Sequence, residues 1–176
     1  MQDINVLVVF ASRTGGTEQL ALVAGLGAVQ AKANIRLRWL REAIEGRAIE
    51  SVPGWKENRE RMEKEYIAPR TVDSEWADAI VIATGGGTSG APAELRDYLA
   101  SLQALSSQGK LAGKVGAAFS SGSEADSAAL LVALAQLDFI LVPSGSQPVA
   151  LEKARHQGRR VTEVARALKR AGTRYS

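Results

Sequence analysis

The sequence predicts an α/β fold in which five parallel strands form a doubly wound sheet of order 2-1-3-4-5, with helices on both faces. Three observations lead to this prediction. Short apolar runs recur along the chain. Most of these runs are apolar throughout, as parallel strands buried on both faces require. Helix-like segments separate them, which is typical of βαβ units. Five strands alternating with five helices fit this doubly wound order.

Each expected element rests on its own pattern. Buried strands are expected at four apolar runs: residues 4–10 (INVLVVF), 79–84 (AIVIAT), 115–120 (VGAAFS) and 139–143 (FILVP). A fifth strand is expected at 35–40 (IRLRWL), where apolar and polar residues alternate as on an edge strand. Helices are expected at residues 16–31, 55–67, 92–105, 124–137 and 153–171. We expect one domain spanning residues 1–176, because no repeat or low-complexity segment divides the chain.

The expected helix at 55–67 is strongly amphipathic. Eight of the eleven residues from Lys56 to Tyr66 are charged, while Trp55, Met62 and Tyr66 share one face with Arg59. Pro53 and Pro69 bracket the segment, as proline often does near helix ends. We expect the narrow apolar stripe to pack on its own chain, and contact with a partner subunit is the alternative.

Composition excludes several classes of protein. The chain has no cysteine and a single histidine, His156, which rules out thiol chemistry, iron–sulfur clusters and a histidine-rich metal site. No leader and no membrane-spanning run is apparent, so we expect a cytoplasmic protein without membrane insertion. The net charge is only +3. The basic residues near the C-terminus fit the solvated face of a helix whose apolar face carries Val161, Val164, Ala165 and Leu168, so no nucleic-acid partner is expected.

Three loops built from glycine and hydroxyl residues follow the first, third and fourth expected strands. They read SRTGGT (12–17), GGGTSG (85–90) and SGS (121–123). In this fold, ligands bind outside the carboxyl ends of the strands, where the strand order reverses. Small residues let a ligand approach the backbone closely. The sequence therefore predicts a ligand site at this edge of the sheet.

The first of these loops predicts a phosphate site. It has neither the Gly-x-Gly-x-x-Gly spacing of a dinucleotide-binding loop nor the Gly-Lys-Ser/Thr of a P-loop. It opens a helix, whose free N–H groups and dipole attract an anion. Ser12, Thr14 and Thr17 add hydroxyl donors, which suit a terminal phosphate, and Arg13 adds a charged donor. The alternative is that Ser12 or Thr14 only caps the helix.

With these motifs in view, the chain resembles the flavodoxin-like superfamily. SRTGGT is similar to the S/T-x-T-G-x-T loop that holds the phosphate of FMN in that superfamily. The segments AIVIATGGGTSGAPAELRDYLASL, GKLAGKVGAAFSSGSEADSA and ALAQLDFILVPSG resemble the WrbA-type branch, the NAD(P)H:quinone oxidoreductases and FMN reductases. The resemblance covers roughly 140 residues. It implies FMN as cofactor, NAD(P)H as co-substrate, a quinone or similar small acceptor, and a homodimer or homotetramer.

The resemblance also implies roles for individual residues. The FMN phosphate would be bound by Ser12, Arg13, Thr14, Gly15, Gly16 and Thr17. The isoalloxazine ring would run along Gly86, Gly87 and Thr88, and its other side and the ribityl chain would be closed by Ser121, Gly122 and Ser123.

Some family positions differ in this chain. The second loop lacks the family's proline and its arginine–aromatic pair, Thr14 stands in place of a tyrosine, and the family's ring-side histidine would fall near Leu137. No catalytic residue is therefore assigned. The sequence favours an FMN-dependent NAD(P)H:quinone oxidoreductase. The alternatives are a flavodoxin-like electron carrier and a binding protein that has lost FMN. The positive net charge argues against the electron carrier.

Overall fold

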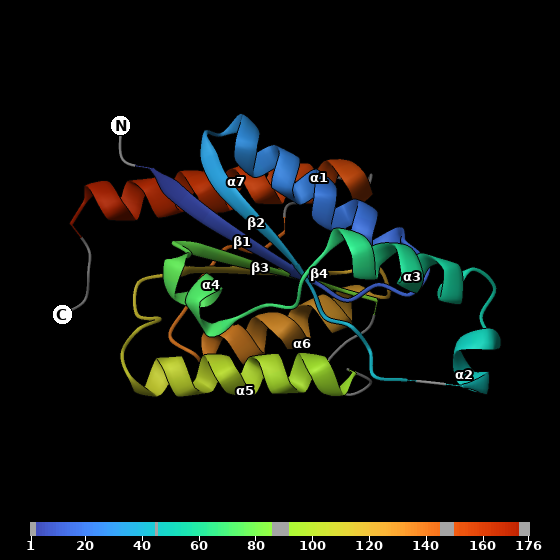
Figure 1. Ribbon diagram of the computed structural model, residues 1–176. Helices are drawn as coiled ribbons and strands as arrows, with labels where there is room; N and C mark the ends of the chain where they lie inside the picture. Colours follow the sequence, from blue (N-terminus) through green and yellow to red (C-terminus); the bar gives the residue numbers. More distant parts are fainter. Residues whose placement is uncertain (1–2, 45, 86–91, 145–149, 173–176) are drawn as a thin grey trace.

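The computed structural model describes residues 3–44, 46–85, 92–144 and 150–172, and it contains a five-stranded parallel sheet (Figure 1). The strand order is β2-β1-β3-β4-β5, as the sequence predicts. The strands are β1 (Ile4–Phe10), β2 (Ala33–Trp39), β3 (Ala79–Thr84), β4 (Val115–Ser120) and β5 (Ile140–Leu141). All pairings are parallel, so every strand ends at the same edge of the sheet.

The two faces of the sheet build two separate cores. Successive side chains of a strand point to opposite faces. Val6, Val8 and Phe10 of β1 accordingly join one buried cluster, and Leu7 and Val9 join the other. This double burial is why β1, β3 and β4 read as continuous apolar runs rather than alternating ones.

Helices cover both faces (Figure 1). One core is closed by α1 (Gly16–Gln30) and α7 (Ala150–Arg170), and the other by α5 (Ala93–Ser107) and α6 (Glu124–Ala135). On α7, Val161 and Ala165 are buried and Val164 and Leu168 pack beside them, as its predicted apolar face requires. Among the described residues, no helix is long and apolar enough to cross a bilayer.

Glycines let α1 and α7 approach each other to backbone contact. A Cβ added to Gly27 would lie 2.0 Å from the carbonyl oxygen of Arg155, and one added to Gly158 would lie 1.8 Å from that of Ala24. No side chain fits in either place. This contact fixes the second half of α1 against α7.

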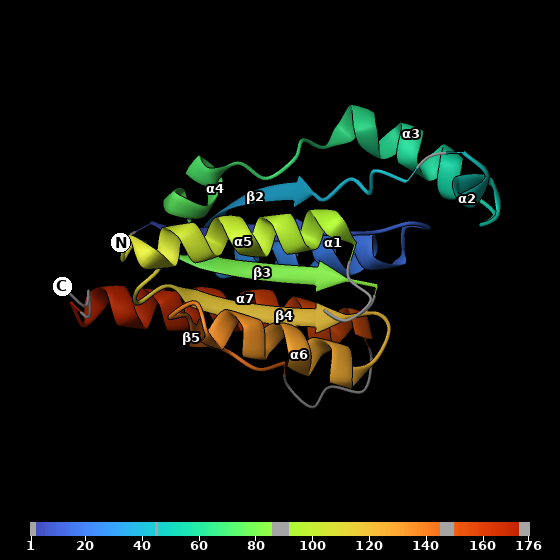
Figure 2. The same cartoon turned by 90° about the horizontal axis from the view of Figure 1, so that it is seen from below.

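The segment between β2 and β3 forms three helices: α2 (Arg47–Glu50), α3 (Trp55–Glu65) and α4 (Thr71–Trp76). Figure 2 shows α3 and α2 beyond β2 at the carboxyl end of the strands. Trp55 and Met62 are buried against the same chain, which confirms the expected packing of the amphipathic helix. The sequence did not predict α2 and α4, because helices of four and six residues are too short to show a 3.6-residue period.

The fifth strand is shorter than the predicted range of 139–143. The ladder is limited to Ile140 and Leu141, with one further bond from the Val142 amide to Gly116. Asp138 has a left-handed φ of 65°, and the Phe139 amide bonds back to the carbonyl of Leu134 at the end of α6. Phe139 therefore belongs to the turn that leaves α6 rather than to the strand.

Candidate functional site

A cavity of about 380 Å³ opens at the edge where the strands end. Its volume lies in the range of small-molecule sites. It is lined by the loop after β1 (Ala11–Thr14, Gly16 and Thr17), by Thr84, Gly85 and Ser121 after β3 and β4, and by Glu42, Val52 and Pro92. The structure thus brings the first and third predicted loops together around one cavity.

The first loop leaves the start of α1 open. Gly15 is the N-cap of α1 and has a φ of 95°, a left-handed conformation that glycine adopts without strain. The Ser12 hydroxyl accepts a hydrogen bond from the Gly15 amide at 3.1 Å, within the loop. Within the described residues no side chain caps α1. The first N–H groups of the helix therefore remain available to an anion, and the capping alternative for Ser12 or Thr14 does not describe this loop.

A hydrogen bond joins the first and third loops. Thr17 Oγ1 and Ser121 Oγ lie 3.0 Å apart. Gly85 sits at this junction, since a Cβ there would lie 3.8 Å from each of the two hydroxyl oxygens. The Ser121 amide also bonds to the carbonyl of Thr84 at 2.9 Å. The ends of β3 and β4 and the start of α1 are therefore held as one unit.

The other residues of the third loop shape the loop rather than line the cavity. The Ser123 hydroxyl accepts from the Asp126 amide at 3.1 Å and so caps α6. A Cβ on Gly122 would lie 2.8 Å from the carbonyl oxygen of Gly85, which explains why a glycine stands there. Asp126 belongs to the cap and Glu124 pairs with Lys153, so both acids suit the positive end of the helix dipole.

Most of the second predicted loop lies outside the described residues. This holds for Gly86, Gly87 and Thr88, which the sequence assigns to the isoalloxazine ring. Gly85 before this segment and Pro92 after it both line the cavity.

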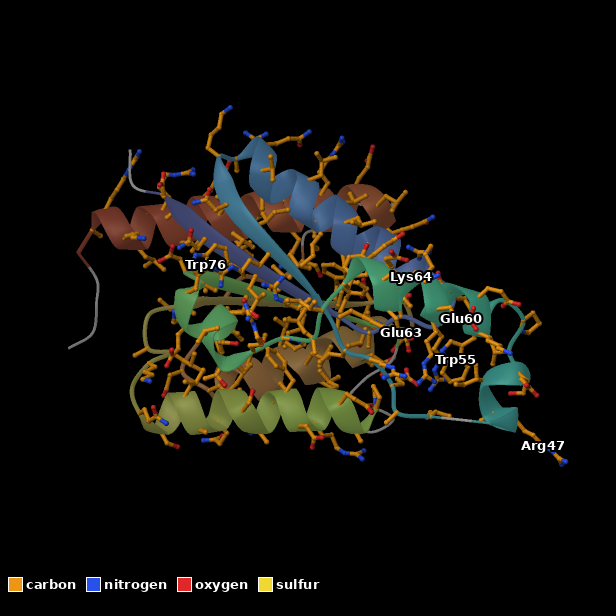
Figure 3. All side chains as sticks on the ribbon, viewed as in Figure 1. Arg47, Trp55, Glu60, Glu63, Lys64 and Trp76 are labelled. Carbon is orange, nitrogen blue, oxygen red and sulfur yellow. The ribbon has the colours of Figure 1, made fainter. Side chains whose placement is uncertain are left out.

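One ion pair, Arg13–Glu42, lies in the cavity wall. The Nε of Arg13 lies 3.1 and 3.0 Å from the two carboxylate oxygens of Glu42. The guanidinium also stacks on Trp55, 4.7 Å from the ring centroid. Figure 3 shows Trp55 at the start of α3, while Arg47 on α2 extends away from the molecule. The sequence did not single out Glu42, although it follows the end of β2 and so lies at the same sheet edge.

A second charged cluster contacts the start of α1 and the loop before it. Glu18, in the first turn of α1, is only 4% exposed and accepts hydrogen bonds from Arg61 and, at 2.8 Å, from the Tyr66 hydroxyl. Burial raises the pKa of Tyr66 to about 12, so its hydroxyl stays a donor at neutral pH. Asn58 donates to the carbonyl of Arg13 at 3.0 Å. Side chains of α3 thus hold both the start of α1 and the loop before it.

The family's ring-side histidine has no counterpart at the expected place. Leu137 is 4% exposed and packs in the apolar core under the sheet. His156 is half-buried in α7 and does not line the cavity. Among the residues that line the cavity, Arg13 and Glu42 are the charged ones.

Comparison with known proteins gives the family. No protein-family model matches the chain. A Deinococcus radiodurans protein named NAD(P)H dehydrogenase (quinone) is 34% identical over 118 residues, which cover 67% of this chain and 58% of that protein. An Archaeoglobus fulgidus protein of the same name is 28% identical over 188 residues, covering 93% of this chain and 98% of that protein. The chain belongs to the WrbA-type, flavodoxin-like family.

Solved structures agree with this family at the level of the fold. A WrbA-like flavodoxin protein from Agrobacterium tumefaciens superposes with a TM-score of 0.62 at 21% identity, covering 94% of this chain and 99% of that one. A flavodoxin from the domain Archaea gives a TM-score of 0.64 at 13% identity, with 93% and 99% coverage. This chain differs from the WrbA-type pattern at two positions. Thr14 stands where that pattern has a tyrosine, and Leu137 lies near the place of its histidine.

Proposed function

We propose that this chain binds FMN at the carboxyl edge of its sheet and transfers electrons from NAD(P)H to a quinone or similar small acceptor. The observation that carries the proposal is the uncapped start of α1, which faces a cavity of about 380 Å³ that is also lined by Ser12, Thr14 and Thr17. The curated relatives are named for the same reaction. The names of these relatives support the same activity for this chain.

The residues fit a flavin phosphate. The N–H groups of Gly16 and Thr17 and the hydroxyls of Ser12 and Thr14 would surround a phosphomonoester at the helix start. Gly15 supplies the left-handed turn that this loop needs. On the other side of the cavity, Ser121 would meet the ring or the ribityl chain, with Gly122 and Ser123 fixing its loop.

The chain's own contribution is binding and orientation. FMN itself supplies the hydride chemistry when bound, and the protein positions it and tunes its electronics. Ala11, Val52 and Pro92 add apolar side chains to the lining of the cavity. The segment 86–91 is assigned to the ring edge from the family resemblance, with Gly86, Gly87 and Thr88 as the contacting residues.

A flavin titration tests the proposal. Purified protein incubated with FMN should turn yellow and quench flavin fluorescence, and it should reduce a quinone at the expense of NAD(P)H. Colour without turnover would favour an electron carrier instead. Protein that stays colourless in excess FMN would indicate a flavodoxin-like binding protein that has lost the cofactor.

Arg13→Glu provides a matched variant for this titration. It reverses the charge at the phosphate loop and places a second carboxylate beside Glu42, so we expect FMN affinity to fall by about tenfold or more, equivalent to about 1.4 kcal/mol. Glu63→Gln on α3 is a suitable control, because Glu63 is paired with Arg41 and Arg59 and does not line the cavity. An FMN affinity that is the same in wild type and Arg13→Glu would contradict the phosphate assignment.

A further inference from the structure

The carboxylate of Glu42 occupies the binding edge of the cavity's one lining arginine. Glu42 is 10% exposed at its side chain, and its two oxygens face the Nε and Nη2 of Arg13 at 3.0 to 3.1 Å. This is the edge of a guanidinium that grips a phosphate or a carboxylate with two parallel bonds. An incoming phosphate therefore meets an arginine whose Nε and Nη2 are already bonded to a carboxylate.

The protein backbone around Glu42 is held from three sides. The Leu40 amide bonds to the carbonyl of Phe10 at 2.8 Å, which ties the segment to the end of β1. The Ala43 amide bonds to the Glu94 carboxylate at 2.6 Å, in the first turn of α5. Arg59 of α3 donates to the carbonyl of Ile44, also at 2.6 Å. The carboxylate is thus held at the cavity wall by main-chain contacts on both sides of it.

Arg13 is held in place as well. Its guanidinium lies over Trp55, which is 4% exposed, and its carbonyl oxygen accepts from Asn58. The pair Arg13–Glu42 is therefore assembled before any ligand arrives, and its charges cancel at the cavity wall. Near the loop, Arg61 pairs with both Glu18 and Glu65, so that cluster offers no uncompensated positive charge. The loop then attracts a dianion through amides and hydroxyls alone.

We propose that Glu42 is a specificity-determining residue that lowers the preference of the cavity for phosphorylated flavin over unphosphorylated flavin. This inference rests on the proposed function. Glu42 does so by competing for Arg13 and by placing a negative charge in the wall that a phosphate must approach. Riboflavin carries no phosphate, so neither effect weakens its binding. The Arg13–Glu42 pair therefore sets how strongly the site selects FMN over riboflavin.

The experiment measures dissociation constants for FMN and riboflavin by quenching of flavin fluorescence. In Glu42→Gln the guanidinium keeps its place over Trp55 but loses the competing charge. We expect the ratio of the riboflavin constant to the FMN constant to rise about tenfold over wild type, equivalent to about 1.4 kcal/mol. In Arg13→Gln the carboxylate is left without its partner, and the ratio should fall below that of wild type. The double variant Arg13→Gln/Glu42→Gln should return toward wild type, since neither charge remains.

Glu63→Gln is the control, because it removes an equal charge from an ion-paired glutamate of α3 that lies outside the cavity wall. Its ratio should equal that of wild type. A ratio that is unchanged or lower in Glu42→Gln would overturn the inference, because it would mean that Glu42 positions Arg13 for the phosphate. In that case binding of FMN by wild type still supports the proposed function. If wild type binds neither flavin, both the proposed function and this inference fail.

Discussion

Asp73 is a fully buried carboxylate held by three arginines. Arg36 and Arg38 of β2 bond to its oxygens at 2.8 to 3.0 Å, and Arg70 pairs with it at the start of α4. Burial alone would raise the pKa of the Asp73 carboxyl. The hydrogen bonds from Arg38 and from the Arg70 amide outweigh burial and hold that pKa well below its usual range. One carboxylate therefore fastens the edge strand to the segment that follows it.

We expect Asp73→Asn to lower the free energy of unfolding by about 3 kcal/mol at pH 7, because it leaves the partly buried guanidinium groups of Arg36 and Arg38 without a charged partner. The pKa is lowered in the folded state, so the carboxylate contributes its stability above about pH 4, the unfolded value, and loses it as the pH falls further. The difference in unfolding free energy between wild type and Asp73→Asn should therefore become smaller below pH 4. Urea titrations at pH 7 and pH 3 measure it, and an equal gap at both would contradict this account.

At the same scale, residues of the site differ in how far the sequence could predict them. The hydroxyl and glycine residues of the loops at Ser12–Thr17 and Ser121–Ser123 stand directly after buried strands, so the end of an apolar run locates them at the sheet edge. Glu42 follows an edge strand that ends in the same place, but it is one charged residue in a charged segment. Nothing in its spacing tells that its carboxylate faces Arg13 rather than solvent. That pairing depends on contacts with β1, α3 and α5 that lie far apart in the sequence.

At the scale of elements, the strands were the most predictable part, because burial on both faces leaves an uninterrupted apolar run. The short helices α2 and α4 were not predictable. They are held by tertiary contacts, such as the burial of Ile49 and the arginines around Asp73, and not by a periodic pattern. The turn before β5 was missed for a related reason. Phe139 is apolar like a strand residue, but its amide bonds to the end of α6.

Two glycines of α1 give a matched test of the contact between α1 and α7. Gly27→Ala places a methyl group 2.0 Å from the carbonyl oxygen of Arg155, so the helices must separate. We expect a loss of about 3 kcal/mol of unfolding free energy, at the upper end for overpacking. Gly25→Ala meets only the ends of two side chains, Ile35 at 3.3 Å and Leu37 at 3.8 Å. Because alanine favours a helix over glycine by about 1 kcal/mol, this variant should be neutral or slightly stabilised.

Thermal or urea unfolding of the two variants measures the difference. Both changes add one methyl group to a buried glycine of the same helix, so helix propensity cancels in the comparison. Equal stabilities of Gly25→Ala and Gly27→Ala would show that α1 and α7 adjust without cost, and would contradict the backbone contact. A flavin titration of Gly27→Ala then reports whether the start of α1 depends on this packing.

At the scale of the whole molecule, the cavity exists only when the chain is folded. Its walls come from the ends of β1, β3 and β4 and from the segment after β2, which the unfolded chain does not bring together. A ligand of this cavity therefore binds the folded state alone and must stabilise it. FMN at one hundred times its dissociation constant should add about 2.7 kcal/mol to the free energy of unfolding. For a chain of this size that corresponds to a rise in Tm of about 5–10 °C.

The rise should depend on the logarithm of the FMN concentration above saturation, as linkage requires. Arg13→Glu serves as the comparison, and its Tm rise is measured from its own ligand-free Tm, because the change also leaves Glu42 beside a second carboxylate. At the same FMN concentration its Tm should rise less, in proportion to its weaker affinity. A Tm of the wild-type protein that stays constant over a hundredfold range of FMN would mean that the flavin does not use a site built from the folded sheet edge. The uncapped start of α1 would then have to serve another anion.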